Sequence, residues 1–329
     1  MLSRIAETLF WLGRYVERAD DTARVLDAFM HRLLDDPGTD EEAACRALFD
    51  ILGVALPKEE SGNCDAQTVM SLLGFDAANP SSVAGAWQAA HANARGVREV
   101  ISAETFECLN VTRRALLAQR RAAGRVGPHA YLRYIKERAA LFYGLADSTM
   151  RRDEGWLFLT LGQSLERADM TARLLSVRVL ASRYAPDWLT LMRAAGADEV
   201  YHRTEGWASD PQSTAGFLVL EDSFPRSIVH ALARAEQCLG ELAGTPQFPR
   251  GAGRGRVRLV APSARRVIGR TRTMLEYLDA DSLGAQLPAV LKELQEACLA
   301  ASRQIAEEYF QYGPPVIWLH GKDDWARVD

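Results

Sequence analysis

Long apolar runs and export signals are absent from this sequence. No stretch approaches the roughly 18 consecutive apolar residues that a helix needs to cross a bilayer. The N-terminal segment is rich in apolar residues, but Glu7, Arg14 and Glu17 interrupt it, so it lacks the apolar core of a signal peptide. We therefore expect a cytoplasmic protein without a membrane partner.

Paired cysteines are also lacking. The five cysteines are odd in number and far apart in the chain: Cys45, Cys64, Cys108, Cys238 and Cys298. No CxxC pair occurs, which argues against a disulfide framework and against a zinc site. A reducing compartment is the natural environment of such a chain.

Several enzyme and metal signatures are missing. The sequence has no GxxxxGK[ST], GxSxG or HExxH motif, and no GxGxxG that follows an expected strand. A ferritin-like di-metal site needs Glu-x-x-His, whereas Glu17 and Glu166 are followed three residues later by aspartates. We therefore expect no cofactor and no redox metal. Nucleic acid is not an expected partner either, because the formal net charge is −4 rather than strongly positive.

The residues that are abundant favour helix. Of the 329 residues, 48% are apolar and 25% are charged, with many Ala, Leu, Arg and Glu, which lose little freedom in a helix. Apolar positions from Ile5 to Met30 recur at alternating steps of four and three, as on one face of a long helix. Asn79 and Pro80 predict the cap and first position of another long helix that runs toward Ser102. The predicted fold class is all-α, a helical bundle.

An internal repeat is the strongest structural signal. Residues 161–175 align with residues 12–26 without a gap, and ten of the fifteen positions are identical. A weaker match aligns residues 224–228 with residues 79–83 at nearly the same offset. We infer two diverged copies of one helical unit. Such copies usually pack about a pseudo-two-fold axis, with equivalent helices meeting at the centre.

The repeat predicts the domain organisation. A first helical repeat occupies residues 1–127, and a linking helix and second repeat occupy residues 128–310. Residues 311–329 are expected to form a non-helical tail, whose apolar residues also suit a self-assembling structural protein. One compact domain overall is the alternative division. Residues 247–258 are rich in Gly and Arg and are expected to form a basic loop.

Two sets of charged side chains lie in the matching segments. The first carboxylate set is Glu17 and Asp20 with Arg24, and the second is Glu166 and Asp169 with Arg173. Spacings of three and four residues place each set on one helix face. If the two helices pack antiparallel, the carboxylates could converge to bind a divalent cation, act as general acids or grip a substrate amine. The alternative is a structural lattice of ion pairs with neighbouring arginines: Arg14, Arg18, Arg24, Arg167 and Arg173.

Two other polar clusters allow two interpretations each. Arg152, Asp153 and Glu154 could hold an anion at a helix start, or could simply cap the helix junction before the second copy. A second cluster lies on a helix that must also pack, and it contains Asn93, Arg95 and Arg98.

The sequence blocks resemble a known family. The opening MLSRIAE, followed by WLGRYVERA at residues 11–19, closely resembles the alpha-E family of bacterial proteins. Its other signature blocks resemble NARGVRE at 93–99, STMRRDEGW at 148–156, LG at 161–162 with ERAD at 166–169, and PRS at 225–227. The resemblance extends from residue 1 to about residue 310. It marks four glutamates by motif: Glu7, Glu17, Glu154 and Glu166.

The resemblance implies a cellular context. Alpha-E proteins are encoded beside, or fused to, circularly permuted ATP-grasp ligase-like proteins and transglutaminase-like peptidases. Such neighbours suggest a system that forms and cleaves amide or peptide bonds. The leading hypothesis is a non-catalytic partner subunit of an ATP-grasp amide ligase that helps present a peptide or amine substrate.

The alternative hypothesis is an enzyme in its own right. Its candidate acid/base or divalent-metal residues are Glu17, Asp20, Glu166 and Asp169. Candidate residues for binding a substrate or partner are Glu7, Arg14, Arg18, Arg24, Asn93, Arg95, Arg98, Arg152, Asp153, Glu154, Arg167, Arg173 and Arg226.

Overall fold

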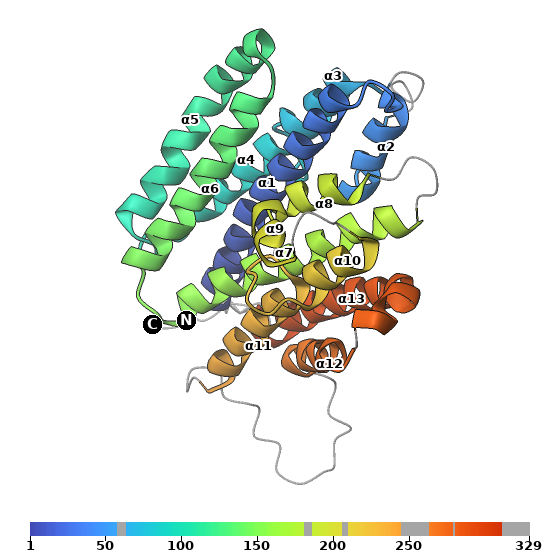
Figure 1. Ribbon diagram of the computed structural model, residues 1–329. Helices are drawn as coiled ribbons and strands as arrows, with labels where there is room; N and C mark the ends of the chain where they lie inside the picture. Colours follow the sequence, from blue (N-terminus) through green and yellow to red (C-terminus); the bar gives the residue numbers. More distant parts are fainter. Residues whose placement is uncertain (58–63, 181–185, 206–209, 245–262, 279, 311–329) are drawn as a thin grey trace, which may run out of the picture.

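The computed structural model describes residues 1–57, 64–180, 186–205, 210–244, 263–278 and 280–310 (Figure 1). The expected tail at 311–329 and basic loop at 247–258 lie outside these residues. Every regular element of the described chain is a helix, which confirms the all-α class.

The first part of the chain forms α1 (Ser3–Asp35), α2 (Glu41–Leu52), α3 (Ala66–Val69), η2 (Met70–Gly74), α4 (Val83–Arg95), α5 (Ala103–Val126) and α6 (His129–Thr149). The second part forms α7 (Glu154–Leu180), α8 (Trp188–Ala195), α9 (Asp198–Glu205), α10 (Pro211–Leu220), α11 (Ile228–Gly244), α12 (Ala264–Glu276) and α13 (Ala280–Tyr309). None of these helices is long and apolar enough to span a bilayer.

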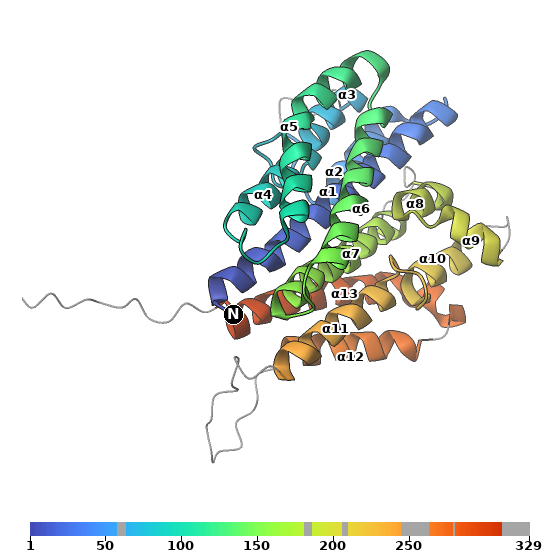
Figure 2. The same cartoon turned by 90° about the vertical axis from the view of Figure 1, so that its left-hand side faces the viewer.

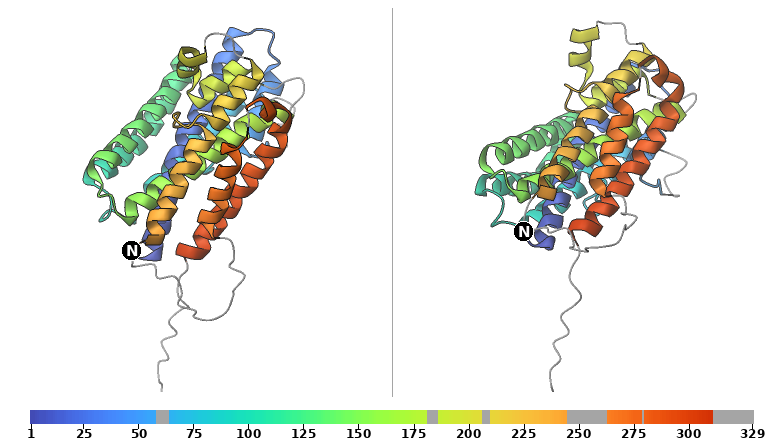
Figure 3. Two further views of the ribbon diagram at one scale, coloured as in Figure 1. Left: turned by 60° about the horizontal axis from the view of Figure 1, so that its bottom comes forward. Right: turned by 90° about the horizontal axis from the view of Figure 1, so that it is seen from below.

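Helices α1 and α7 are the central pair, and the other helices are arranged around them (Figures 1 and 2). The hairpin α5–α6 and helix α4 pack on the α1 side. Helices α11, α12 and α13 lie side by side on the α7 side (Figure 3). In addition, α8 packs on α1 and α2 packs on α7, so short helices cross between the two halves.

Two glycines allow the central helices to touch. A Cβ atom at Gly13 would lie 2.1 Å from the Leu159 carbonyl oxygen, and one at Gly162 would lie 2.0 Å from the Phe10 carbonyl oxygen. Only glycine fits at such a close backbone contact. The contacts are reciprocal, because Gly13 and Gly162 occupy matching positions of the repeat.

The central helices run in the same general direction. Their N-terminal ends meet where the Met1 ammonium lies 2.9 Å from Glu154 Oε2. Further along, Arg18 of α1 lies beside Glu166 of α7, so equivalent positions stay together. The antiparallel packing considered from the sequence is therefore wrong for this pair.

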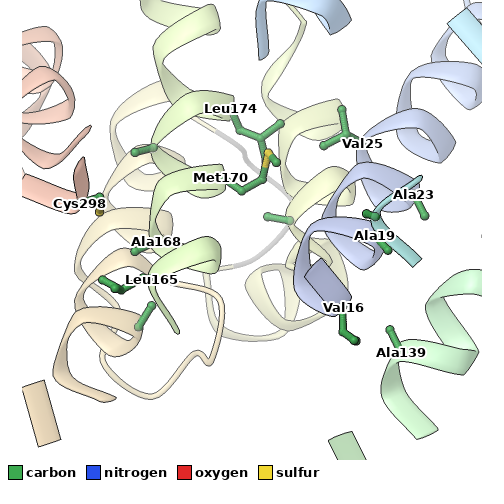
Figure 4. Close-up of a cluster of buried hydrophobic side chains, with 14 of the residues drawn as sticks. Val16, Ala19, Ala23, Val25, Ala139, Leu165, Ala168, Met170, Leu174 and Cys298 are labelled. Carbon is green, nitrogen blue, oxygen red and sulfur yellow. The ribbon is translucent and has the colours of Figure 1, made fainter. Parts of the chain in front are cut away.

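The predicted apolar stripe forms the core of α1. Val16, Ala19 and Ala23 are fully buried, as the three-four spacing requires. In Figure 4, Met170 and Leu174 point from α7 toward the side of α1 that carries Val25. Burial of these small and branched side chains keeps water away from the polar groups of the same helices.

The helix predicted from Asn79 begins later and ends earlier than expected. Ser82 is its N-cap, because the Ser82 hydroxyl accepts the Gly85 N–H at 2.9 Å. The Asn79 side chain instead accepts the Ser81 N–H and shapes the turn before the helix. The helix ends at Arg95, and Ser102 caps the separate helix α5.

Candidate functional site

The first carboxylate set is buried at the crossing of α1 and α7. Glu17 is 0% exposed. Its carboxylate accepts hydrogen bonds from Arg167 Nε at 2.6 Å and Gln163 Nε2 at 3.2 Å, both from α7. The Arg226 Nη1 atom lies 3.3 Å from Glu17 Oε1. The glutamate is therefore held by groups from outside its own helix.

Arg226 closes this set. It comes from the turn before α11, and its guanidinium donates to both Asp20 and Asp21. Asp20 also accepts a hydrogen bond from Arg24 Nε at 3.0 Å, one turn further along α1. One arginine side chain thus fills the space among three buried carboxylates.

The second carboxylate set is built by different neighbours. Glu166 accepts hydrogen bonds from Arg14 Nε and Arg18 Nε, each at 2.5 Å. Asp169 accepts a hydrogen bond from Arg173 Nε at 2.9 Å, which repeats the Asp20–Arg24 contact. The two cations of Glu166 both come from α1.

Two equivalent ion pairs cross between the matching segments. Arg18 of α1 binds Glu166 of α7, and Arg167 of α7 binds Glu17 of α1. The two sets meet at one helix crossing, as expected from the repeat. They do not merge into one cluster of four carboxylates. Within the described chain, the first set forms a close group with Asp21 that does not include the second set.

The arginines keep both central glutamates ionised. Burial by itself raises the pKa of Glu17, but the positive charges of Arg167 and Arg226 outweigh that effect and the pKa is lowered. For Glu166, Arg14 and Arg18 likewise outweigh burial and bring the pKa to about 2. These two glutamates are poorly suited to donate a proton at neutral pH.

Two aspartates behave differently. Burial raises the pKa of Asp21 well above its usual value, and repulsion from Glu17 and Asp20 adds to the rise despite the attraction of Arg226. Burial also raises the pKa of Asp169, which Arg173 only partly offsets. Asp169 also borders open space, unlike Glu17.

The two sets differ at three matching positions. Where the first set has Asp21, the second has Met170; where the first has Gln163, the second has Arg14; and the residue that matches Arg226 is Ser81. The second set consequently retains a cavity of about 210 Å³, lined by Arg14, Arg18, Thr22, Leu52, Gly53, Ser81, Glu166, Asp169, Met170 and Arg173. We call this the Ser81 cavity.

A larger cleft adjoins the second set. It has a volume of about 820 Å³, and it shares Arg14, Asp169 and Arg173 with the Ser81 cavity. Its other walls mix apolar side chains such as Trp11 with polar ones such as Gln295, from α1, α2, α7 and α13. We call it the α7–α13 cleft. It has the mixed lining expected of a ligand pocket.

The remaining candidates lie away from this site. Arg152 pairs with Asp147 at 2.9 Å and stacks over Trp156, while Asp153 accepts the Gly155 N–H. Glu154 binds the Met1 ammonium. The cluster before the second copy is thus occupied by contacts of the helix junction, as the capping interpretation expected.

The Asn93 cluster and Glu7 do not contribute to either carboxylate set. Arg95 and Arg98 are exposed at the turn between α4 and α5, and the Arg98 guanidinium lies 4.4 Å from the Phe106 ring centre. Asn93 is partly buried on α4. Glu7 is partly buried in the second turn of α1.

Among the residues that the structure describes, two groups of side chains have metal-ligand chemistry. Glu17, Asp20 and Asp21 form the first, but the Arg226 guanidinium already supplies their cation. Asp27, His31 and His129 form the second. Here His129 Nδ1 lies 2.8 Å from Asp27 Oδ1, and Lys136 Nζ lies 2.5 Å from Asp27 Oδ2. A lysine therefore supplies a positive charge at this group.

Sequence reasoning missed several residues of the site. Asp21 and Thr22 lie inside the repeated segment, and Ser81 lies in the weaker match, yet none was singled out. The available signal was the mismatch between the aligned copies, Asp21 against Met170 and Ser81 against Arg226. The His31–His129 pair gave no signal, because the two residues come from separate helices.

The chain belongs to the Alpha-E family. The family model, described as a predicted alpha-helical domain with a conserved ER motif, matches residues 1–310. Glu-Arg occurs at 17–18 and at 166–167, where the two dipeptides exchange the crossed ion pairs.

Relatives of the chain include uncharacterized proteins of Mycobacterium bovis and Mycobacterium tuberculosis. Each is 26% identical over 332 aligned residues, which cover 92% of this chain. The chain spans only 36% of the length of these relatives. No solved structure matches it.

Proposed function

We propose that this chain is a non-catalytic subunit of an amide-bond-forming system. It docks onto a circularly permuted ATP-grasp ligase-like protein and presents a peptide or amine substrate, in a system that also contains a transglutaminase-like peptidase. The family resemblance supplies these partners. The relatives, in which the matched region is part of a much longer chain, are consistent with a module that works beside other domains.

One observation supports a binding role over catalysis. Glu17 and Glu166 are each paired with two arginines, and their pKa values are lowered, so neither is available as a general acid. The α7–α13 cleft, in contrast, offers open space beside charged and apolar side chains. A buried lattice that fixes the walls of a cleft suits presentation of a substrate.

The test is reconstitution with the ligase. We expect the purified chain to copurify with the ATP-grasp protein in near-stoichiometric amount, measured by size-exclusion chromatography with mass determination. ATP-dependent amide formation by the ligase should fall when the chain is omitted. Separate elution of the two proteins, with unchanged ligase activity, would rule out this proposal.

A second candidate function, an enzyme that uses helix-borne carboxylates, is favoured by Asp169 alone. This residue lines both the cleft and the Ser81 cavity, and burial raises its pKa. Asp169→Asn is the critical variant, with Asp20→Asn at the matching position as its control. If Asp169→Asn abolishes activity of the reconstituted system while circular dichroism, complex formation and substrate binding all stay normal, the enzyme hypothesis is favoured over substrate presentation.

We also propose that the two repeats are related by a pseudo-two-fold axis near the Gly13–Gly162 contact. Matching details support it. Gly53 and Gly196 end α2 and α8 with φ of 63° and 64°, and a Cβ on either would press on the matching arginine, Arg173 or Arg24. Superposition of residues 1–127 on 128–310 in an experimental structure tests this relation. A cytoplasmic location is likewise proposed, and cell fractionation tests it.

A further inference from the structure

The Ser81 cavity is the space that an arginine fills in the other half of the molecule. Arg226 inserts its guanidinium among the carboxylates of the first set. At the matching position of the second set, Ser81 has only a short side chain. The space therefore stays open, with a volume of about 210 Å³, more than ten times the roughly 10–15 Å³ that one water needs.

Charge balance explains why the second set is stable with this space unfilled. In the first set, Arg226 supplies the second cation of Glu17. In the second set, Arg14 takes that role from the opposite side, where the first set has Gln163. Glu166 is thus neutralised without any group entering the cavity. The second set has Met170 at the position that matches Asp21, so it lacks the carboxylate that would have required a cation in the cavity.

The cavity carries a surplus of positive charge. Arg14, Arg18 and Arg173 line it, against the two carboxylates Glu166 and Asp169. When Asp169 takes up a proton, the surplus grows. Among the residues that the structure describes, Arg173 donates only through Nε, so its terminal nitrogens stay available beside Gly53. An anion is the ligand that such a lining selects.

A buried hydroxyl gives the second, independent observation. Thr22 is 0% exposed, lines the cavity, and its Oγ1 has no hydrogen-bond partner. At the matching position, the Thr171 hydroxyl donates to the Arg226 carbonyl oxygen at 3.2 Å. A buried hydroxyl without a partner is costly, and an acceptor atom of a ligand in the cavity would satisfy it.

We propose that the Ser81 cavity binds the carboxylate of a free amino acid or of a peptide C-terminus. Arg173 supplies charged N–H donors from its terminal nitrogens, and Arg18 supplies them from Nη1, because its Nε and Nη2 already bind Glu166. Thr22 and Ser81 supply hydroxyls, and this set of donors suits a planar anion with a single charge. The α7–α13 cleft, which shares Arg14, Asp169 and Arg173, provides room for the rest of the molecule. This inference deepens the proposed function, because it names the substrate group that the chain holds.

The binding test uses the isolated full chain and four probes. Isothermal titration calorimetry with tetra-alanine, its C-terminal amide, free alanine and inorganic phosphate separates the possibilities. We expect a carboxylate to bind at one site per chain, and the amide to bind at least tenfold more weakly than tetra-alanine. Tight binding of free alanine identifies the amino acid as the source, and binding of tetra-alanine alone identifies a peptide end. Equal binding of tetra-alanine and its amide, or preference for phosphate, overturns the proposal.

Two variants locate the binding. Thr22→Val is expected to weaken carboxylate binding about tenfold, which corresponds to one hydrogen bond to a charged group, with the fold intact. Thr171→Val at the matching position is the control and should leave binding unchanged. The double variant Ser81→Arg with Met170→Asp introduces the arginine and the carboxylate that fill this space in the first set and should abolish binding. Persistent binding in that folded double variant would contradict the assignment.

The carboxylate-binding test and the ligase-docking test can fail separately. These titrations contain no partner protein, so failure to bind a carboxylate would leave a docking role intact. Failure to copurify with the ligase would, in turn, leave carboxylate binding intact.

Discussion

At matching positions of the repeat, the first carboxylate set is closed by Arg226 and the second is open beside Ser81. Both sets keep a buried glutamate ionised by two arginines. They differ in where the second arginine comes from: the turn before α11 for Glu17, and α1 itself for Glu166. Two matching sites can therefore share one electrostatic framework, while the space that Arg226 fills beside Asp20 and Asp21 stays open beside Ser81.

The largest expected effect comes from the central glutamates. Glu166→Gln leaves Arg14 and Arg18 without their carboxylate, and should lower the free energy of unfolding by about 3–5 kcal/mol. Glu17→Gln should cost less, because Arg226 keeps Asp20 and Asp21 as partners. Urea denaturation measures both. A larger loss of unfolding free energy for Glu17→Gln than for Glu166→Gln would contradict the stabilising role given to Arg226.

The same pair has a pH dependence. The folded-state pKa of Glu166, about 2, lies below the ordinary glutamate value of 4.5. Its stabilisation is therefore complete above about pH 4.5 and is lost as the pH falls toward 2. The difference in stability between wild type and Glu166→Gln should shrink over that range.

Opening the first set should have the next largest effect. Arg226→Met leaves Asp20 and Asp21 buried without that cation, at a cost of about 3 kcal/mol at neutral pH. The pKa of Asp21 is already raised, so the variant should regain stability as the pH falls and that carboxyl takes up a proton. Thermal unfolding at pH 8 and pH 5 measures the recovery. Ser81→Ala, at the matching position, should change stability by less than about 0.5 kcal/mol.

Substitution of either glycine at the crossing of α1 and α7 should have the same effect on stability. Gly13→Ala and Gly162→Ala each place a methyl group against a backbone carbonyl, and each should cost about 1–3 kcal/mol. Guanidinium denaturation of the two variants gives the comparison. A marked difference between them would mean that the contacts are reciprocal in geometry but not in energy.

The smallest effect concerns the matched threonines. Thr171→Val removes a hydrogen bond to the Arg226 carbonyl and should cost about 1 kcal/mol. Thr22→Val removes a buried hydroxyl without a protein partner, so the unliganded protein should keep or gain stability. Differential scanning calorimetry resolves the sign. Equal losses in both variants would show that Thr22 has a partner within the protein.

Sequence periodicity predicted much of this site. The three-four spacing placed Glu17 with Asp20 and Glu166 with Asp169, and the internal repeat predicted that equivalent helices meet. The direction of packing was wrong, since spacing along one helix does not determine how a second helix crosses it. The division into residues 1–127, 128–310 and 311–329 stays a prediction.

The cavity could not be derived in the same way. Its existence depends on a side chain that is short, Ser81, and on the side from which Arg14 approaches Glu166. The alignment contained the difference between Ser81 and Arg226, but only the structure shows that Arg226 binds the first carboxylate set and that Ser81 lines a cavity beside the second.

The crossed pairs at α1 and α7 have a further consequence. Each copy carries both a glutamate acceptor and an arginine donor for the other, and a glycine that admits the other backbone. A single repeat would therefore present a self-complementary surface to a second molecule of itself. The contact between α1 and α7 thus resembles an isologous interface between two subunits, in which each partner offers the same groups to the other, although both helices here belong to one polypeptide.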